Sequence, residues 1–459
     1  MKQNKMKIII VLLVCMFTIP LVVHGATQPP SPEQQGDNAQ DTILITGANI
    51  FDGESSELIN GMDVLIEDNK ITQIGSNITA PEGALTIDAD GATLMPGLID
   101  VHWHSLMASL PQALVLQSDM GYLNIAAAQS NREALLRGFT TVRDVGGNVF
   151  GLKRATDQGI VDGPRIYPSG AYISQTSGHG DFRGPNDIPL DPGAPLDYFQ
   201  RNAMTLIADG VPEVTKRTRE VLRMGASQVK VMAGGGVSSV YDPLDVTQYT
   251  FDEMKAIVDV AKTWNTYVAI HANTDDAIQQ AIEAGVKCVE HGFLMSEETV
   301  QMMADNDVWL SMEPILNDED AIPFEPGSVQ QDKFIQVTDG TDKIINLAKQ
   351  YGVKIAFGTD TLFDPELAAK QGKQLAKLQR WFTPYETLKM ATYDNAQLLK
   401  LSGPRDPYPD ELGVVKEGAY ADLILVDGNP LENLDLIANP DENFVLIMKD
   451  GNIYKNTLQ

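Results

Sequence analysis

The chain of 459 residues contains only two cysteines, Cys15 and Cys288, and few basic residues. Cys15 falls in an N-terminal segment that we expect to be removed, so Cys288 stands alone and no intrachain disulfide is available to the mature fold. Lys and Arg number 34 against 62 Asp and Glu, which gives a net charge of −28 and no basic cluster that would suggest a nucleic-acid partner. The composition is that of an ordinary acidic globular protein whose stability comes from its core.

The first 26 residues are typical of a signal peptide. Three lysines precede the apolar residues 8–23, and Gly25 and Ala26 are small residues suited to cleavage. Because Pro20 interrupts the apolar run, which is short for a membrane-spanning helix, the pattern favours secretion across the inner membrane, with a periplasmic mature chain, over an uncleaved anchor. Residues 27–41 follow as a polar linker rich in Pro and Gln.

Both ends of the remaining chain are predicted to be β-rich. Short strands separated by turns fill residues 42–95, and residues 403–459 contain two further apolar strands, 421–426 and 444–453. Between these ends, residues 96–402 alternate strands with helices, which gives a parallel sheet and suits a closed (β/α)₈ TIM barrel of the α/β class. The clearest expected strands are 267–271, 288–291, 308–312 and 354–357, and the clearest expected helices are 250–261, 277–284, 296–305 and 341–351.

The pair His102 and His104 stands at the end of an apolar run. If Leu94 to His104 is one β-strand, its period of two sends both imidazoles to the same face, where their nitrogens can converge on one metal ion. The spacing alone fits a half-exposed strand face equally well. The other histidines must therefore decide between the two interpretations.

Four of the six histidines end predicted strands. His271 and His291 join the first pair, and Lys230 and Asp360 occupy the same kind of position. The carboxyl ends of the strands of a (β/α)₈ barrel meet at its active face, so these side chains are predicted to share one cavity. A single histidine in such a place is usually an ordinary core residue, but four together favour a metal site.

Lys230 lies in an apolar strand just before three consecutive glycines. A buried ammonium needs a carboxylate partner or a changed chemical state. One interpretation is a buried ion pair. The other is a neutral amine that takes up CO₂ and becomes a carbamate, whose two oxygens bridge two metal ions.

Asp360 ends the segment Phe357-Gly358-Thr359-Asp360 and has two possible roles. It is a favourable helix N-cap residue. At the end of a barrel strand it would instead ligate a metal, accept the proton of a metal-activated water and return that proton to the leaving amine.

Together these residues resemble the metal-dependent amidohydrolase superfamily over nearly the whole chain. His102-Trp103-His104 is similar to its first-strand H-x-H, Lys230 to its carboxylated lysine, and His271, His291 and Asp360 to its later ligands. The resemblance implies a barrel beside a small β-sandwich built from both chain ends. It also implies two divalent metal ions, with zinc as the expected metal: His102 and His104 at the buried ion, His271 and His291 at the exposed ion, and Lys230 bridging as its carbamate.

Three segments, residues 174–181, 230–238 and 242–245, resemble one branch of that superfamily. The branch comprises zinc-dependent Xaa-Pro dipeptidases, Xaa-Arg or Xaa-Lys carboxypeptidases and ochratoxinase-like amidases. This resemblance implies release of a C-terminal amino acid from dipeptides, short peptides or N-acyl amino acids, and a homo-oligomer by analogy. It also implies that His179 donates a hydrogen bond to the scissile carbonyl and that Tyr241, or less favourably Arg183, holds the substrate's terminal carboxylate.

Two alternatives stay open. The first is another hydrolase of the same superfamily that opens a cyclic amide, whereas mononuclear deaminases lack the bridging lysine and are disfavoured by Lys230. The second is a non-catalytic binding protein, which would have to keep all six metal positions without using them.

Overall fold

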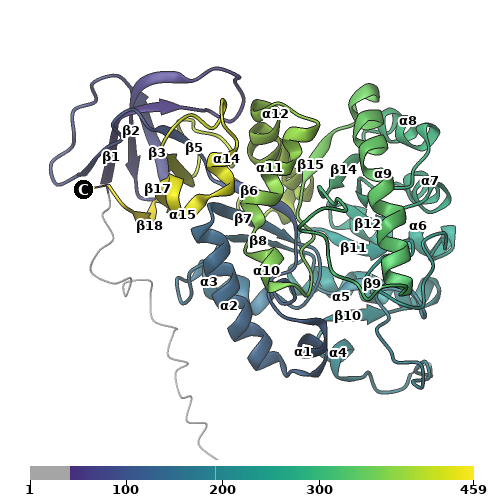
Figure 1. Cartoon of the computed structure of the whole chain (residues 1–459). Coiled ribbons are helices and arrows are strands. Elements are labelled where there is room, and N and C mark those ends of the chain that lie inside the picture. The colour runs from purple at the N-terminus through teal and green to yellow at the C-terminus, as the bar shows by residue number, and fades with distance from the viewer. Residues whose placement is uncertain (1–41, 192, 459) are drawn as a thin grey trace, which may run out of the picture. The chain divides into compact units, whose positions relative to one another are not determined.

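The structure is a computed structural model that describes residues 42–191 and 193–458. The predicted signal peptide, residues 1–26, and the predicted linker, residues 27–41, lie outside the described residues. Within the described part, β-rich segments flank a middle in which strands and helices alternate (Figure 1). No helix in this part combines the length and the apolar composition that crossing a membrane requires.

The two ends of the described chain meet in one eight-stranded sheet, coloured purple and yellow in Figure 1. Its strands are β1 (Thr42–Ile50), β2 (Ile59–Glu67), β3 (Lys70–Gly75), β4 (Leu85–Asp88), β5 (Thr93–Pro96), β16 (Leu423–Val426), β17 (Phe444–Lys449) and β18 (Asn452–Asn456). The order is β18-β17-β16-β5-β1-β2-β3, and β4 pairs with β1. The antiparallel ladder of β5 with β16, in which Leu94 lies opposite Leu425, joins the two ends.

The middle of the chain forms two parallel sheets. Their strands are β6 (Leu98–Trp103), β7 (Phe139–Asp144), β8 (Arg165–Pro168), β9 (Tyr172–Ser174), β10 (Thr205–Ile207), β11 (Val229–Met232), β12 (Val268–Ala272), β13 (Cys288–His291), β14 (Trp309–Met312) and β15 (Ile355–Phe357). One sheet has the order β6-β7-β8 and the other β10-β9-β11-β12-β13-β14-β15. Single backbone hydrogen bonds cross between the sheets, from Asp360 N to His102 O at 2.9 Å and from Ser227 N to Pro168 O at 2.8 Å. The closed form of the barrel and the sandwich form of the terminal sheet stay predictions.

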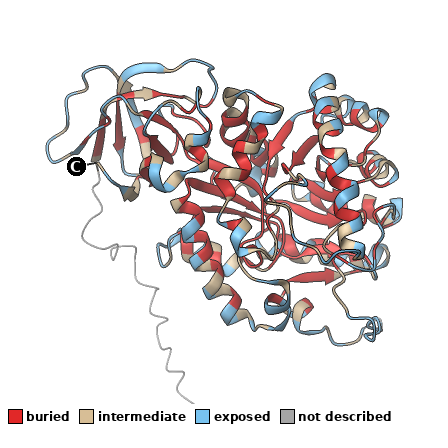
Figure 2. Ribbon diagram, viewed as in Figure 1, coloured by how far each residue is buried: buried red, intermediate tan, exposed pale blue. Residues whose placement is uncertain are grey.

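Helices follow most of the parallel strands and cover them (Figure 1). They are α1 (Gln112–Gln117), α2 (Met120–Leu136), α3 (Phe150–Asp157), α4 (Tyr198–Arg201), α5 (Gly210–Met224), α6 (Phe251–Thr263), α7 (Asp275–Ala284), α8 (Glu297–Asp305), α9 (Val329–Tyr351), α10 (Pro365–Ala368), α11 (Gln371–Ala376), η1 (Lys377–Arg380), α12 (Pro384–Lys389), η2 (Met390–Asp394), α13 (Asn395–Leu399), η3 (Lys400–Arg405), α14 (Asp435–Ala438) and α15 (Pro440–Asn443). Their outer faces are exposed, whereas the strands are buried (Figure 2).

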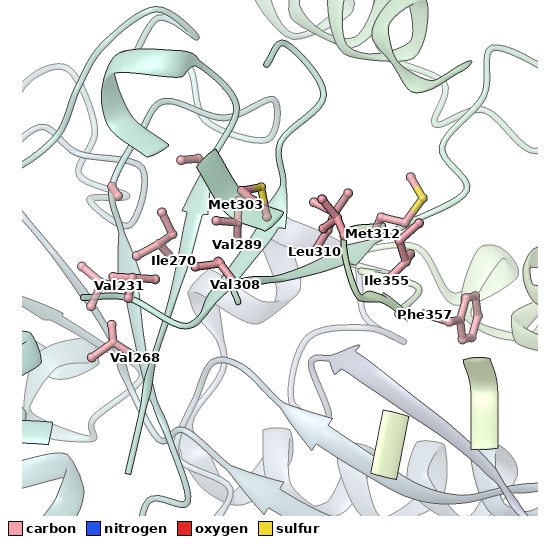
Figure 3. Packing of buried hydrophobic residues seen from close by; sticks show 14 of the residues in the cluster. Val231, Val268, Ile270, Val289, Met303, Val308, Leu310, Met312, Ile355 and Phe357 are labelled. Atoms are coloured by element: carbon pink, nitrogen blue, oxygen red, sulfur yellow. The ribbon is translucent and has the colours of Figure 1, made fainter. Parts of the chain in front are cut away.

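Successive side chains along a parallel strand face alternately the apolar core under the helices and the interior that holds the site. In β12, Val268 and Ile270 join a large apolar cluster with helix residues such as Met303 of α8 (Figure 3). Ala269 belongs to a different cluster, which lies on the other face of the strand. Because successive side chains point to opposite faces, His271 shares the face of Ala269 and is turned away from the helices.

The predicted strand and helix positions in the middle of the chain agree with the structure to within a few residues, with one exception. Thr250 and Glu253 form a capping box at the start of α6, the helix expected from residue 250. The helix expected at residues 341–351 begins earlier, at Val329, because Ser328 accepts a hydrogen bond from Gln331 N and caps it. Gly340 lies inside α9, where an added Cβ would stand 2.1 Å from Phe293 O.

The expectation that Leu94 to His104 is one strand is wrong. The chain changes sheets at Gly97: β5 pairs with β1 and β16, whereas β6 pairs with β7. Gly97 N donates to Asp422 O at 2.8 Å, and a Cβ at Gly97 would lie 2.1 Å from Thr140 Oγ1. A glycine is therefore needed where the terminal sheet gives way to the first parallel strand.

Candidate active site

The structure brings all six predicted metal ligands into one cavity of about 390 Å³. The ligands belong to five different strands or follow them directly: His102 and His104 at β6, Lys230 in β11, His271 in β12, His291 in β13 and Asp360 after β15. All but Lys230, which is the second residue of β11, lie at or near the carboxyl ends of parallel strands, where side chains of a (β/α)₈ fold meet.

Asp360 and the first histidine pair converge as ligands of a cation would. Asp360 Oδ1 lies 3.2 Å from His102 Nε2 and 3.3 Å from His104 Nε2. The same oxygen is buried and takes part in no hydrogen bond with the described residues. Two imidazole nitrogens and a carboxylate oxygen that crowd together without hydrogen bonding fit a bound divalent metal ion.

The charge state of Asp360 suits a ligand. Its burial would raise the pKa, but the neighbouring His102 and the contacts with His102 and His104 hold the pKa of Asp360 well below its usual range. The carboxylate form is therefore the stable one.

Lys230 has no carboxylate within ion-pair distance among the described residues. Its side chain is about 1% exposed, and burial lowers its pKa despite the more distant charges of Glu290 and Asp360. The buried ion pair, one of the two interpretations of this lysine, therefore has no support in the geometry. A lowered pKa favours the neutral amine that carbamate formation requires.

His271 and His291 form the second half of the ligand set. Their ring centroids lie 4.4 Å apart, and His291 lies 5.1 Å from His102 by the same measure. Burial and the neighbouring His179 hold the pKa of His271 well below its usual value, so its imidazole is neutral and able to ligate.

Two buried glutamates, Glu290 and Glu313, contact the ligands His102 and His291. Neither glutamate was predicted from the sequence. His291 Nδ1 lies in hydrogen-bond contact with Glu313 Oε2 at 2.9 Å, and His102 Nδ1 lies 3.0 Å from both Glu290 and Glu313. Metal-binding histidines commonly present their second nitrogen to a carboxylate, which fixes the ring and its tautomer. The only signal in the sequence was that Glu290 lies within the expected strand 288–291 and that Glu313 directly follows the expected strand 308–312.

His291 reaches the cavity because its backbone leaves the β conformation. In β13, Cys288 and Glu290 share the inner face, so regular alternation would send His291 outward with Val289. His291 instead has a φ of 78°, in the left-handed region that non-glycine residues rarely adopt. This turn lets Glu290 and His291 both face the site, and such strained residues are typical of functional positions.

His179 lies beside the ligands at the cavity wall. Its ring stacks on His271 with centroids 4.1 Å apart, and its Nδ1 lies 2.8 Å from Ser239 Oγ and 3.0 Å from Asp242 Oδ2. Buried Lys333 holds the same loop by donating to the carbonyl oxygens of Gly236, Ser239 and Asp242.

Tyr241 and Arg183 line an adjoining cavity of about 580 Å³ instead of the metal cavity. Tyr241 is 58% exposed, and the guanidinium of Arg183 donates hydrogen bonds to both carboxylate oxygens of Asp181. The two cavities share Gln112, Phe182, Ser238 and Gln330, so they adjoin. The predicted carboxylate-binding roles of Tyr241 and Arg183 stay predictions, and the pairing with Asp181 weakens Arg183 as a candidate.

Residues 93–456 match the amidohydrolase family. The chain belongs to this family. Ochratoxinase of Aspergillus niger is 32% identical over 441 residues, which cover 91% of this chain and 88% of the relative. A crystal structure of a prolidase complexed with N-methylphosphonate-L-proline is 33% identical with a TM-score of 0.83 and covers 91% of this chain and 100% of its own. A Xaa-Pro dipeptidase structure with bound methionine is 28% identical with a TM-score of 0.77 and covers 90% and 100%.

This amidohydrolase is therefore a hydrolase that acts on C–N bonds, as the sequence resemblance implied. The ochratoxinase, the prolidase and the Xaa-Pro dipeptidase confirm the predicted branch. The family is typically metal-dependent, and the described residues include two groups of three possible ligands whose atoms lie within 4.8 Å of one another, His102 with His104 and Asp360, and His102 with His291 and Glu313.

Proposed function

We propose that this amidohydrolase holds two divalent metal ions, with Zn²⁺ as the expected metal, and hydrolyses peptide or N-acyl amide bonds to release a C-terminal amino acid. The observation that carries the proposal is Lys230, which is buried without an ion-pair partner among the described residues and lies in one cavity with five further ligands. As a carbamate, Lys230 supplies the negative charge that four neutral imidazoles lack. The backbone hydrogen bonds that link the two parallel sheets, from Asp360 N to His102 O and from Ser227 N to Pro168 O, support a closed (β/α)₈ barrel as the scaffold.

The residues divide the chemistry between them. His102, His104 and Asp360 would hold one ion, His271 and His291 the other, and the Lys230 carbamate would contact both. When bound, the ions polarise the scissile carbonyl and activate the attacking water. Asp360 accepts a proton from that water on a carboxylate oxygen and returns it to the leaving nitrogen. His179 donates a hydrogen bond from Nε2 to the scissile carbonyl oxygen, where negative charge develops.

Two measurements test the proposal. Metal analysis of the purified protein should find about two divalent ions per chain, and one or none would exclude a binuclear site. A panel of dipeptides and N-acetyl amino acids, assayed for amino-acid release, should contain substrates. Turnover of lactams or hydantoins with no turnover of the panel would assign the enzyme to cyclic-amide hydrolysis instead.

Asp242 has a positioning role in this scheme. Burial would raise the pKa of Asp242, but its hydrogen bond with His179 lowers it, so a carboxylate faces His179 Nδ1. This contact leaves Nε2 as the atom that faces substrate and stabilises the ring as a donor. Asp242→Asn should lower kcat about 10- to 100-fold with little change in KM, which steady-state kinetics measure.

A double variant separates this role from support of the loop. In a His179→Gln background, Asp242→Asn should cause no further loss of kcat, because the carboxylate acts through the ring. Independent, multiplicative losses would show that Asp242 acts otherwise, since it also accepts a hydrogen bond from Gly236 N at 3.0 Å.

A further inference from the structure

The metal cavity has an extensive apolar wall. We use this name for Phe182, Phe293, Ile322, Phe324, Phe334 and Phe363, which all line the cavity. The rings of Phe324 and Phe334 lie 5.7 Å apart in a tilted arrangement, and the ring of Phe293 lies 6.1 Å from that of His291. The wall therefore begins directly beside a metal ligand, within reach of a substrate bound there.

The cavity has few carboxylates that could pair with a basic side chain. Among its described lining residues only Asp360 and Asp364 are acidic. Asp360 contacts the histidines, and Asp364 caps α10 through Oδ1 alone, which accepts hydrogen bonds from Glu366 N and Leu367 N, both at 3.0 Å. Away from Asp364, a lysine or arginine side chain would lose its water without gaining an ionic partner.

The described lining of the cavity also lacks a free cation that could pair with an acidic side chain of the substrate. Apart from the histidines, Lys230 is the only basic residue among the described residues that line the cavity, and it belongs to the ligand set. An additional carboxylate on the substrate would thus face the apolar wall or compete for the ligands.

Ion pairs of Asp320 fix the segment that carries Ile322 and Phe324 of the apolar wall. Ile322 and Phe324 lie between β14 and α9, in a segment whose Asp320 is paired with Lys370 at 2.8 Å, Lys373 at 3.0 Å and Lys377 at 3.3 Å. The side chain of Asp320 is only 1% exposed, so these pairs anchor the segment to α11 and its surroundings. A preformed apolar surface discriminates between side chains better than a mobile one, because less ordering is required on binding.

We propose that the enzyme selects amide substrates that carry a large apolar side chain, aromatic above all, and discriminates against basic and acidic ones. This inference rests on the proposed amide hydrolysis. The apolar wall, which includes the Phe324–Phe334 pair, receives that side chain beside the metal ligands. Among the activities of the predicted branch, release of C-terminal arginine or lysine is therefore disfavoured.

The experiment measures kcat/KM of the metal-loaded enzyme for two matched series. N-acetyl-Phe, -Leu, -Ala, -Lys and -Glu vary the released residue, and Phe-Gly, Ala-Gly, Lys-Gly and Glu-Gly vary the acyl residue. In at least one series the Phe member should exceed the Lys and Glu members by more than about 100-fold and the Ala member by about 10-fold or more. That series identifies which side of the scissile bond contacts the wall.

Phe324→Ala tests the assignment to the wall. Phe324 is half-buried at the cavity surface, and the variant should lose about 10-fold or more in kcat/KM for the Phe substrate while the Ala substrate changes less than about threefold. The matched control is Phe251→Ala, because Phe251 is 40% exposed on α6 and does not line the cavity. This control should leave the Phe-to-Ala ratio unchanged.

The outcomes separate the two proposals. Turnover in which Lys or Glu members equal the Phe member, or in which Phe324→Ala leaves the Phe-to-Ala ratio unchanged, overturns the selectivity and leaves amide hydrolysis in place. No turnover of any member by enzyme with its full metal content removes the proposed function, and the selectivity with it.

Discussion

Lys230→Ala should lower kcat/KM by more than a factor of about 1,000, equivalent to about 4 kcal/mol of transition-state stabilisation, and should lower the bound metal. The variant removes the ligand proposed to contact both ions and leaves a small cavity where the side chain lay. Because Lys230 forms no ion pair with a described residue, its removal leaves no buried carboxylate without a partner. We therefore expect a large catalytic effect with a small change in stability, measured by kinetics, metal analysis and thermal unfolding.

Short carboxylic acids provide the decisive readout. Acetate or propionate can enter the space left by the lysine and offer two oxygens in place of the carbamate, so activity and metal content of Lys230→Ala should rise with acid concentration. Lys449→Ala is the matched control, because Lys449 is also buried but lies in the terminal strand β17. It should show no response to the acids, and undiminished activity of Lys230→Ala would refute the bridging role.

The ligand set was predictable because each residue lies within or directly after an apolar strand, and all but Lys230 lie at or near its carboxyl end. Parallel strands of one sheet bring their carboxyl ends to the same edge, so Lys230, His271 and Asp360 could be placed together without knowledge of their distances. The residue types then indicated the chemistry.

The supporting glutamates were not predictable, because regular alternation would place Glu290 and His291 on opposite faces of β13. The left-handed φ of 78° at His291 lets both side chains face the site, and no local sequence pattern predicts this backbone conformation. Glu313 follows β14 as Asp360 follows β15, but a single glutamate after a strand has too many ordinary explanations to be selected.

The errors in the fold have similar causes. The change of sheet at Gly97 cannot be seen in the apolar run around it, because β5 and β6 are both buried. The two strands differ only in the strands with which they pair. The helix expected at residues 341–351 extends back to Val329 through Gly340, a residue of low helix propensity that packs closely on the backbone of Phe293. In both places a tertiary contact, which sequence periodicity does not contain, determines the structure.

Arg143→Met should lower the free energy of unfolding by about 3–5 kcal/mol. Arg143 is fully buried beneath the ligands and donates two hydrogen bonds to Glu290, at 2.7 and 2.8 Å. Burial would raise the pKa of Glu290, and the Arg143 guanidinium holds it well below its usual range. Methionine fills much of the volume but leaves this carboxylate without its partner, and the cost appears as a lower urea midpoint of the metal-free protein.

Two further variants isolate the cause. Arg132→Met removes a second Arg–carboxylate pair, with Asp162, but both side chains are about half exposed, and the expected loss is below about 1 kcal/mol. Adding Glu290→Gln to Arg143→Met should recover part of the lost stability, because a neutral buried amide costs less than an unpaired carboxylate. If the double variant is no more stable than Arg143→Met alone, lost packing and the lost bonds to Val101 O and Tyr267 Oη account for the effect, and the unpaired charge of Glu290 does not.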